Sequence, residues 1–192
     1  MSKKIVALIP ARSGSKRVKN KNIKKLKSHP LIAYTIRAAI KSNVFDEVLC
    51  ITDSLKYKKI AEKYGAKVPF LRPKKISKEK SSDIEWVVWA INKINKRNEF
   101  KIFSILRPTN PLRDETTIKR AFKKFLNNKC DSLRAVDLCK QHPYKMWKIK
   151  GNYMKPIFNV RSKVPYHSRQ YADLPEIYTQ NASLEIAWTR LL

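Results

Sequence analysis

The feature that most constrains the fold is an unbroken apolar run near the N-terminus. Residues 3–9 read KKIVALI, and the run stops at Pro10. Apolar residues that do not alternate with polar ones are typical of a strand covered on both faces, as in a parallel sheet packed between helices. The run IVALI is shorter than the ~7–15 residues of a signal peptide's apolar region, and no stretch reaches the ~18 residues of a membrane span. We therefore predict a buried first strand and no membrane association.

The rest of the chain alternates apolar strands with amphipathic helices. We predict further strands at 46–52, 66–71, 100–106, 131–138 and 182–188, and helices at 30–42, 54–64, 81–96 and 114–127. This alternation predicts an α/β fold with a doubly wound, mostly parallel sheet of the Rossmann-like type. Ligands of such sheets bind at the carboxyl ends of the strands, which here places the loops 10–29, 72–82 and 107–113 together.

The 192 residues suit one domain spanning 1–192. Residues 140–175 interrupt the alternation, because they are rich in proline, tyrosine and basic residues and show no clear period. We interpret 140–175 as an excursion from the sheet that forms a dimerisation arm, and expect a homodimer.

The net charge of +28, with a pI near 10.2, is typical of proteins that bind nucleic acid or anionic membranes. However, most of the 43 basic residues are lysines spread along the whole chain, as a sequence-wide lysine bias would produce. We find no nucleic-acid-binding module and expect no specific nucleic-acid partner. The three cysteines are widely spaced without a CxxC pattern, which indicates reduced thiols in a cytoplasmic protein.

The loop after the first strand has the residues of a phosphate site. A Ser-Gly-Ser turn can direct backbone N–H groups at phosphate oxygens, and flanking cations add charge. The loop is neither a P-loop nor a dinucleotide fingerprint, since GK[ST] and GxGxxG are absent. Composition alone leaves a basic solvent loop as the alternative. The candidate residues are Arg12, Ser13, Gly14, Ser15, Lys16 and Lys21.

This segment resembles the signature loop of the acylneuraminate cytidylyltransferases, the CMP-sialic acid synthetases and their legionaminate and pseudaminate relatives. The pattern of that family runs PARGGSKGxPxKN. The segment in this chain departs from the pattern at Ser13 and Arg17, where glycines are usual, and at Lys19, where proline is usual. The matching positions are Pro10, Ala11, Arg12, Gly14, Ser15, Lys16, Lys21 and Asn22.

Further segments resemble the same family over nearly the whole chain. ITD at 51–53 is similar to its STD motif, and LRP at 71–73, followed by Ser81 and Ser82, to its nucleotide-contacting segment. LRPTNPLR at 106–113 resembles LQPTSPLR, with Arg107 in place of glutamine. SRQ, LPEIY and NASLEI between residues 168 and 186 resemble RQDLPE…NGAIYI, with Ala182 in place of glycine.

The resemblance implies a nucleotide-diphospho-sugar transferase-like fold. It also implies transfer of CMP from CTP to a sialic-acid-like, acidic nine-carbon nonulosonate, with release of pyrophosphate, for cell-surface polysaccharide biosynthesis. It implies a catalytic role for Lys21 and Arg12, with Lys21 stabilising charge in the transition state. The implied nucleotide-binding residues are Arg12, Ser13, Gly14, Ser15, Lys16, Lys21, Asn22, Arg72, Ser81 and Ser82. The implied sugar-binding residues are Arg107, Thr109, Asn110, Arg169, Gln170 and Asn181.

The family also implies Mg²⁺, held by an aspartate pair in a segment that follows the NGAIYI-like strand. No such pair precedes Leu192 in this sequence, so we identify no metal ligands and expect a fragment, or ligands supplied by a partner. Three alternatives stay open: a sister enzyme that activates 3-deoxy-manno-octulosonate, a non-catalytic CTP-binding remnant, and a basic nucleic-acid-binding protein. Asp53 is either a strand-end cap or a ligand.

Overall fold

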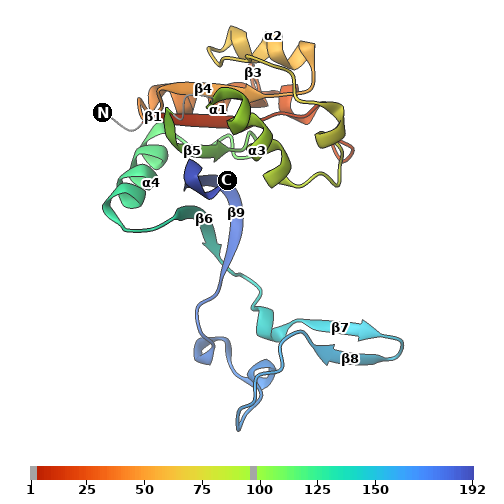
Figure 1. Cartoon of the computed structure of the whole chain (residues 1–192). Coiled ribbons are helices and arrows are strands. Elements are labelled where there is room, and N and C mark those ends of the chain that lie inside the picture. Colours follow the sequence, from red (N-terminus) through yellow and green to blue (C-terminus); the bar gives the residue numbers. More distant parts are fainter. Residues whose placement is uncertain (1–3, 96–98) are drawn as a thin grey trace. The chain divides into compact units, whose positions relative to one another are not determined.

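The computed structural model describes residues 4–95 and 99–192 and divides the chain into two compact units (Figure 1). The sheet unit comprises residues 1–134 and 182–192, and the hairpin unit comprises residues 135–181. The hairpin unit contains the whole of the segment 140–175 that the sequence sets apart. Its role in dimerisation stays a prediction.

The sheet unit is built on five strands in the order β4-β1-β5-β9-β6. β1 (Lys4–Pro10) lies at the centre of a parallel group, between β4 (Glu47–Ile51) and β5 (Phe100–Leu106). β9 (Tyr178–Trp188) runs antiparallel to β5, and β6 (Ser132–Leu138) forms the far edge. The predicted α/β fold with a mostly parallel sheet is confirmed.

In the described ranges four α-helices connect these strands, and three of them begin at side-chain caps that the sequence offers. They are α1 (Leu31–Lys41), α2 (Leu55–Lys63), α3 (Asp83–Ile94) and α4 (Glu115–Asn127). The Ser54 side chain caps α2 and Asp114 caps α4, while Ser82 and Glu85 form a capping box on α3. α3 ends at Ile94, and Lys96, to which the sequence extends this helix, lies outside the described residues, as does Lys3 at the start of the first predicted strand.

The centre of β1 is buried on both faces, which accounts for its unbroken apolar run. Val6, Ala7, Leu8 and Ile9 are all 0% exposed. On one face, Val6 and Leu8 pack in a cluster with Trp86 and other apolar residues of α3. α1 contacts both β1 and α4.

The predicted strand at 66–71 is wrong, because only Lys67 pairs there. Its N–H donates to Val48 and its carbonyl accepts from Cys50, both at 2.9 Å, in an isolated parallel bridge beside β4. Two residues later Pro69 has no N–H to continue a ladder. The segment therefore leaves the sheet edge after one pair and leads into the loop before α3.

The hairpin unit contains a two-stranded ribbon and short turns. β7 (Trp147–Lys150) pairs antiparallel with β8 (Tyr153–Pro156), and Gly151 takes a left-handed φ of 59° in the turn. Three 3₁₀ turns of this unit are η3 (Pro143–Lys145), η4 (Tyr166–Ser168) and η5 (Tyr171–Asp173). The sheet unit adds β2 (Lys25–Leu26), β3 (His29–Pro30), η1 (Lys21–Ile23), η2 (Lys74–Ile76) and η6 (Thr189–Leu191). Within the described ranges, no helix is both long and apolar enough to cross a membrane.

Candidate functional site

A polar pocket of about 300 Å³ lies at the carboxyl ends of β1 and β5. The loop after β1, the segment before α3, the first turn of α3 and the turn after β5 form its walls. This is the edge at which parallel α/β sheets bind ligands. Eight of the residues singled out in the sequence line it: Arg12, Ser15, Lys21, Asn22, Arg72, Ser81, Arg107 and Thr109.

The first loop is anchored to the end of β4 by Asp53. The backbone N–H of Ser13 donates to one oxygen of this carboxylate at 2.8 Å, and the Ser13 hydroxyl donates to the other at 3.1 Å. Within the loop, the Ser15 N–H donates to the Ser13 carbonyl at 3.0 Å. Asp53 therefore sets the course of the loop, and Ser13 supplies both of the hydrogen bonds that fix it.

The basic residues of this loop differ in how far they are already paired. Lys16 is 77% exposed and contacts Glu79 at 2.6 Å, and the hydrogen bond from Lys16 lowers the pKa of that carboxyl. Arg12 donates through Nη1 to the Lys78 carbonyl at 2.9 Å and has no carboxylate partner in the described chain. Lys21 lines the pocket, likewise without an ion pair to a described residue. Of the basic residues in this loop, Arg12 and Lys21 are the two that line the pocket without an ion pair to a described residue.

Two further residues of the pocket wall are nearly buried. Arg72 is 6% exposed, donates through Nε and Nη2 to the Ile76 carbonyl, and lies over the Trp86 ring at 5.5 Å. Burial lowers its pKa. Asn22 is 5% exposed and donates to the Arg12 carbonyl at 3.3 Å. Both side chains shape the pocket as well as line it.

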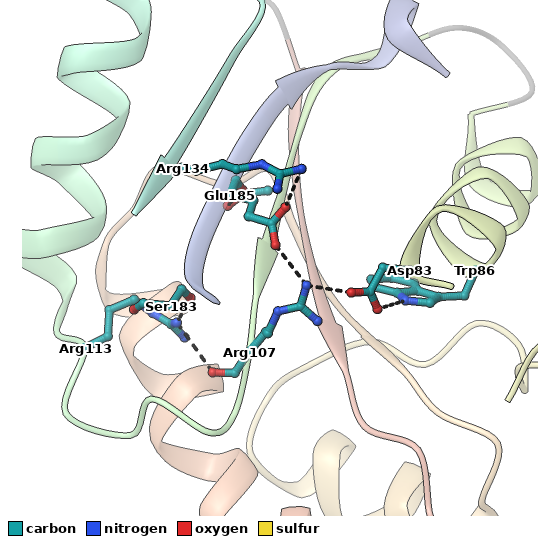
Figure 2. A network of polar contacts seen from close by, with 8 residues as sticks. Asp83, Trp86, Arg107, Arg113, Arg134, Ser183 and Glu185 are labelled. Carbon is teal, nitrogen blue, oxygen red and sulfur yellow. Dashed lines mark hydrogen bonds and ion pairs between the residues drawn. The ribbon is translucent and has the colours of Figure 1, made fainter. Parts of the chain in front are cut away.

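Arg107 lies between two carboxylates that sequence reasoning did not connect with it (Figure 2). Its Nη2 donates to Asp83 Oδ2 at 2.8 Å and to Glu185 Oε1 at 2.9 Å. Glu185 also contacts Arg134 at 3.5 Å, and Asp83 accepts from Trp86 Nε1 at 2.8 Å. Burial acts to lower the pKa of Arg107, but its hydrogen bonds to Asp83 and Glu185 outweigh burial and raise it.

The sequence hints at one member of this cluster, Glu185, but not at the contacts among its members. Glu185 is a charged residue inside an apolar strand, ASLEIAW, and such a residue needs a partner when it is buried. Asp83 reads as a helix cap, and it does begin α3. Nothing local indicates that the two acids meet at Arg107.

Other predicted site residues do not line this pocket. Ser82 caps α3, and Gly14 is exposed, with open space where a Cβ would lie. In the hairpin unit, Arg169 lies over the Tyr166 ring at 4.3 Å and donates to Ser162 at 3.2 Å. Eight predicted site residues are absent from the pocket lining, and their ligand contacts stay predictions. They are Ser13, Gly14, Lys16, Ser82, Asn110, Arg169, Gln170 and Asn181.

The carboxylates around the pocket do not form a Mg²⁺ site. Mg²⁺ takes oxygen ligands in octahedral geometry, mostly carboxylates and waters. Asp53 accepts from Ser13, Glu79 is paired with Lys16, and Asp83 is held by Arg107 and Trp86. No group of three or more His, Cys, Asp or Glu residues that could hold a metal ion occurs in the part of the chain that the structure describes. The described residues therefore do not fit the metal that the family implies.

Comparison with known proteins identifies the family of the chain. The sequence profile of a family described as cytidylyltransferase matches residues 6–187. The chain is 44% identical over 125 residues to the N-acylneuraminate cytidylyltransferase of Escherichia coli, covering 65% of this chain and 29% of that protein. It is 33% identical over 187 residues to the CMP-N,N'-diacetyllegionaminic acid synthase of Legionella pneumophila, covering 96% and 78%. The matched part therefore spans less than a third of the E. coli relative.

Among solved structures, the fold is similar to that of CMP:2-keto-3-deoxy-manno-octonic acid synthetase, with a TM-score of 0.69 at 16% identity, covering 96% of this chain and 74% of the other. This likeness concerns the fold alone. The profile match covers nearly the whole chain and reaches all five strands of the sheet. The chain belongs to the cytidylyltransferase family.

Proposed function

We propose that the chain transfers CMP from CTP to a nonulosonate, an acidic nine-carbon sugar, and releases pyrophosphate. The observation that carries the proposal is the pocket at the carboxyl edge of the sheet, where Arg12 and Lys21 lie beside the buried Arg72 without an ion pair to any described residue. A triphosphate is the anion that such a pocket suits in a cytidylyltransferase. The relatives named for N-acylneuraminate and for diacetyllegionaminic acid support a nonulosonate as the acceptor.

The reaction needs alignment and charge neutralisation more than covalent help from the protein. The anomeric hydroxyl oxygen of the sugar attacks the α-phosphorus of CTP, the bond from that phosphorus to the bridging oxygen of the β-phosphate breaks, and pyrophosphate leaves. The hydroxyl proton passes to solvent. Lys21 and Arg12 would hold the triphosphate and offset the negative charge that develops on it, while Asn22, Arg72 and Ser81 would lie around the ribose and cytosine.

The remaining assignments are part of the same proposal. Ser15 would donate to phosphate from the loop, and Arg107 and Thr109 would contact the sugar. The hairpin unit would form a homodimer, since Trp147, Ile149 and Met154 of the β7–β8 ribbon are 40%, 75% and 62% exposed. We expect the reaction to take place in the cytoplasm.

The test measures the release of pyrophosphate from CTP, in buffer that contains Mg²⁺, with N-acetylneuraminate, legionaminate or pseudaminate as the acceptor. The sugar 3-deoxy-manno-octulosonate serves as the competing acceptor. Calorimetry with CTP and ATP should show a clear preference for CTP. Equal affinity for the two nucleotides would indicate a general polyanion site and would contradict the proposal.

A non-catalytic CTP-binding protein is the second candidate, and one observation favours it. The carboxylates around the pocket are already engaged, so the described residues offer no metal ligands. Selective binding of CTP with no pyrophosphate release from any acceptor would favour this candidate over the enzyme.

A further inference from the structure

We propose that Arg107 recognises an uncharged oxygen of the acceptor sugar, a hydroxyl or an acylamino carbonyl, and that Asp83 and Glu185 position it for this contact. The proposal rests on the proposed function, since it concerns the acceptor of that reaction. It departs from the simplest expectation for an arginine in the pocket of an acid-binding enzyme, which is a contact with the sugar's carboxylate.

The first step is the geometry of the guanidinium. Nη2 carries both carboxylate contacts, at 2.8 Å to Asp83 and 2.9 Å to Glu185. Nε is buried without a hydrogen-bond partner among the described residues, and Nη1 bonds none of them. Arg107 lines the pocket. Two carboxylates bound to one nitrogen therefore hold the guanidinium in place and leave Nη1 as the donor that a ligand can meet (Figure 2).

The second step is the charge balance. The ion-paired cluster holds Arg107 and Arg134 with Asp83 and Glu185, and Arg72 adds positive charge near Asp83. An anion that approaches Nη1 is attracted by the Arg107 guanidinium and repelled by the two carboxylates bound to it. It must also lose its hydration, which costs a charged group far more than a neutral one. A carboxylate therefore gains little at this position.

The third step is the chemistry that remains favourable. A hydroxyl or amide carbonyl oxygen accepts a hydrogen bond from a charged donor without meeting this repulsion, and it costs little to dehydrate. Nη1 of Arg107 is the donor that such an oxygen can meet. By contrast, Arg12, Lys21 and Lys78 line the pocket without an ion pair to a described carboxylate. The first loop therefore binds anionic groups, and Arg107 donates hydrogen bonds to neutral groups of the sugar.

The kinetic experiment compares each active acceptor with its carboxamide, in which the sugar's carboxylate is neutral. R107Q should raise KM at least tenfold for both acceptors and leave the ratio of their KM values unchanged within twofold. E185Q should raise KM severalfold, and the double variant should behave like R107Q alone, because Glu185 acts through Arg107. The dissociation constant of CTP should stay unchanged throughout. If R107Q removes the discrimination between acid and carboxamide, Arg107 binds the carboxylate and the proposal is overturned.

The matched control is E47Q, which removes a carboxylate paired with Lys67 at 2.8 Å on the far side of the sheet's parallel group. It should leave KM and its acid-to-carboxamide ratio as in the wild type. A rise in KM with E47Q equal to that with E185Q would mean that loss of any ion pair weakens the acceptor site, and would count against positioning by Glu185.

A second measurement does not depend on turnover. In protein with ¹⁵N-labelled arginine, with the Arg107 signal assigned from R107Q, sodium acetate should leave the Arg107 Nε resonance of the wild type unmoved against sodium chloride of equal strength. In E185Q, or in D83N if E185Q does not fold, acetate should shift it, because one opposing charge is gone. A shift in the wild type overturns the proposal. Absence of pyrophosphate release from any acceptor would instead count against the proposed function, and the acetate titration would still decide the role of Arg107.

Discussion

Replacing Lys21 and Lys16 separately with alanine should distinguish two lysines that the family resemblance both places at the nucleotide. Lys21 lines the pocket with no ion pair to a described residue, so under the proposed function its removal deletes a charge-assisted contact to phosphate worth about 1.5–3 kcal/mol. At 1.4 kcal/mol per tenfold, CTP affinity should fall about 10–150-fold. Lys16 is 77% exposed and already paired with Glu79, and exposed pairs contribute about 0–1 kcal/mol. Its removal should weaken CTP binding by about fivefold or less.

Calorimetry with CTP at physiological ionic strength measures both variants, and turnover should fall at least tenfold for Lys21→Ala. Thermal unfolding serves as the control for folding, because neither lysine is buried. The reasoning is refuted if Lys16→Ala weakens CTP binding as much as Lys21→Ala does. In that case the triphosphate would break the Lys16–Glu79 pair, and the pairing seen in the free protein would not predict which cations meet phosphate.

Three shorter predictions follow from other contacts. Asp53→Asn should weaken CTP binding severalfold with little loss of stability. The Ser13 N–H and hydroxyl each need an acceptor oxygen, and an amide offers only one. Unchanged affinity for CTP would mean that other contacts fix the loop. Duplex DNA should bind weakly and without sequence preference, and the binding should vanish near physiological salt. The logarithm of the association constant should fall by ~0.9 per phosphate contact for each tenfold rise in salt. Tight binding at physiological salt would show that the +28 charge has a nucleic-acid target. Ala182→Gly should raise the midpoint of thermal unfolding, whereas Ala187→Gly in the same strand should lower it.

Much of the sheet unit could be predicted because its signals are local. β1 is buried on both faces, so every residue from Val6 to Ile9 is apolar, and this run identifies a parallel sheet. Ser54 and Asp114 cap helices through contacts three residues away, within reach of sequence reasoning. The loop after β1 was recognisable from its motif, and the structure places Arg12, Ser15 and Lys21 in one pocket.

The rest depends on contacts between residues far apart in the chain. Arg107 meets Glu185 across 78 positions and Asp83 across 24, and no periodicity reports such a meeting. The segment 66–71 has strand-like composition but sits at a sheet edge where only Lys67 finds a partner. Pairing of Lys16 with Glu79 is likewise set by how two loops approach each other, so composition could not show that one basic residue is already balanced.

Three departures from the family's motifs separate into two kinds once their surroundings are known. Ser13, where glycine is usual, gains a hydroxyl hydrogen bond to Asp53, and Arg107, where glutamine is usual, gains two carboxylate partners. Ala182, where glycine is usual, has a left-handed φ of 55°. A Cβ in this conformation destabilises the folded state by about 1–2 kcal/mol. Glycine removes that strain, but it also raises the conformational entropy of the unfolded chain, which lowers the free energy of unfolding by about 0.4–1 kcal/mol. The net gain of Ala182→Gly is therefore about 0–1.6 kcal/mol, and each 1 kcal/mol raises the midpoint by ~2–4 °C at this chain length. Ala187 has no such strain, so the same change there only loses packing and order. If the two variants shift the midpoint alike, Ala182 is not strained.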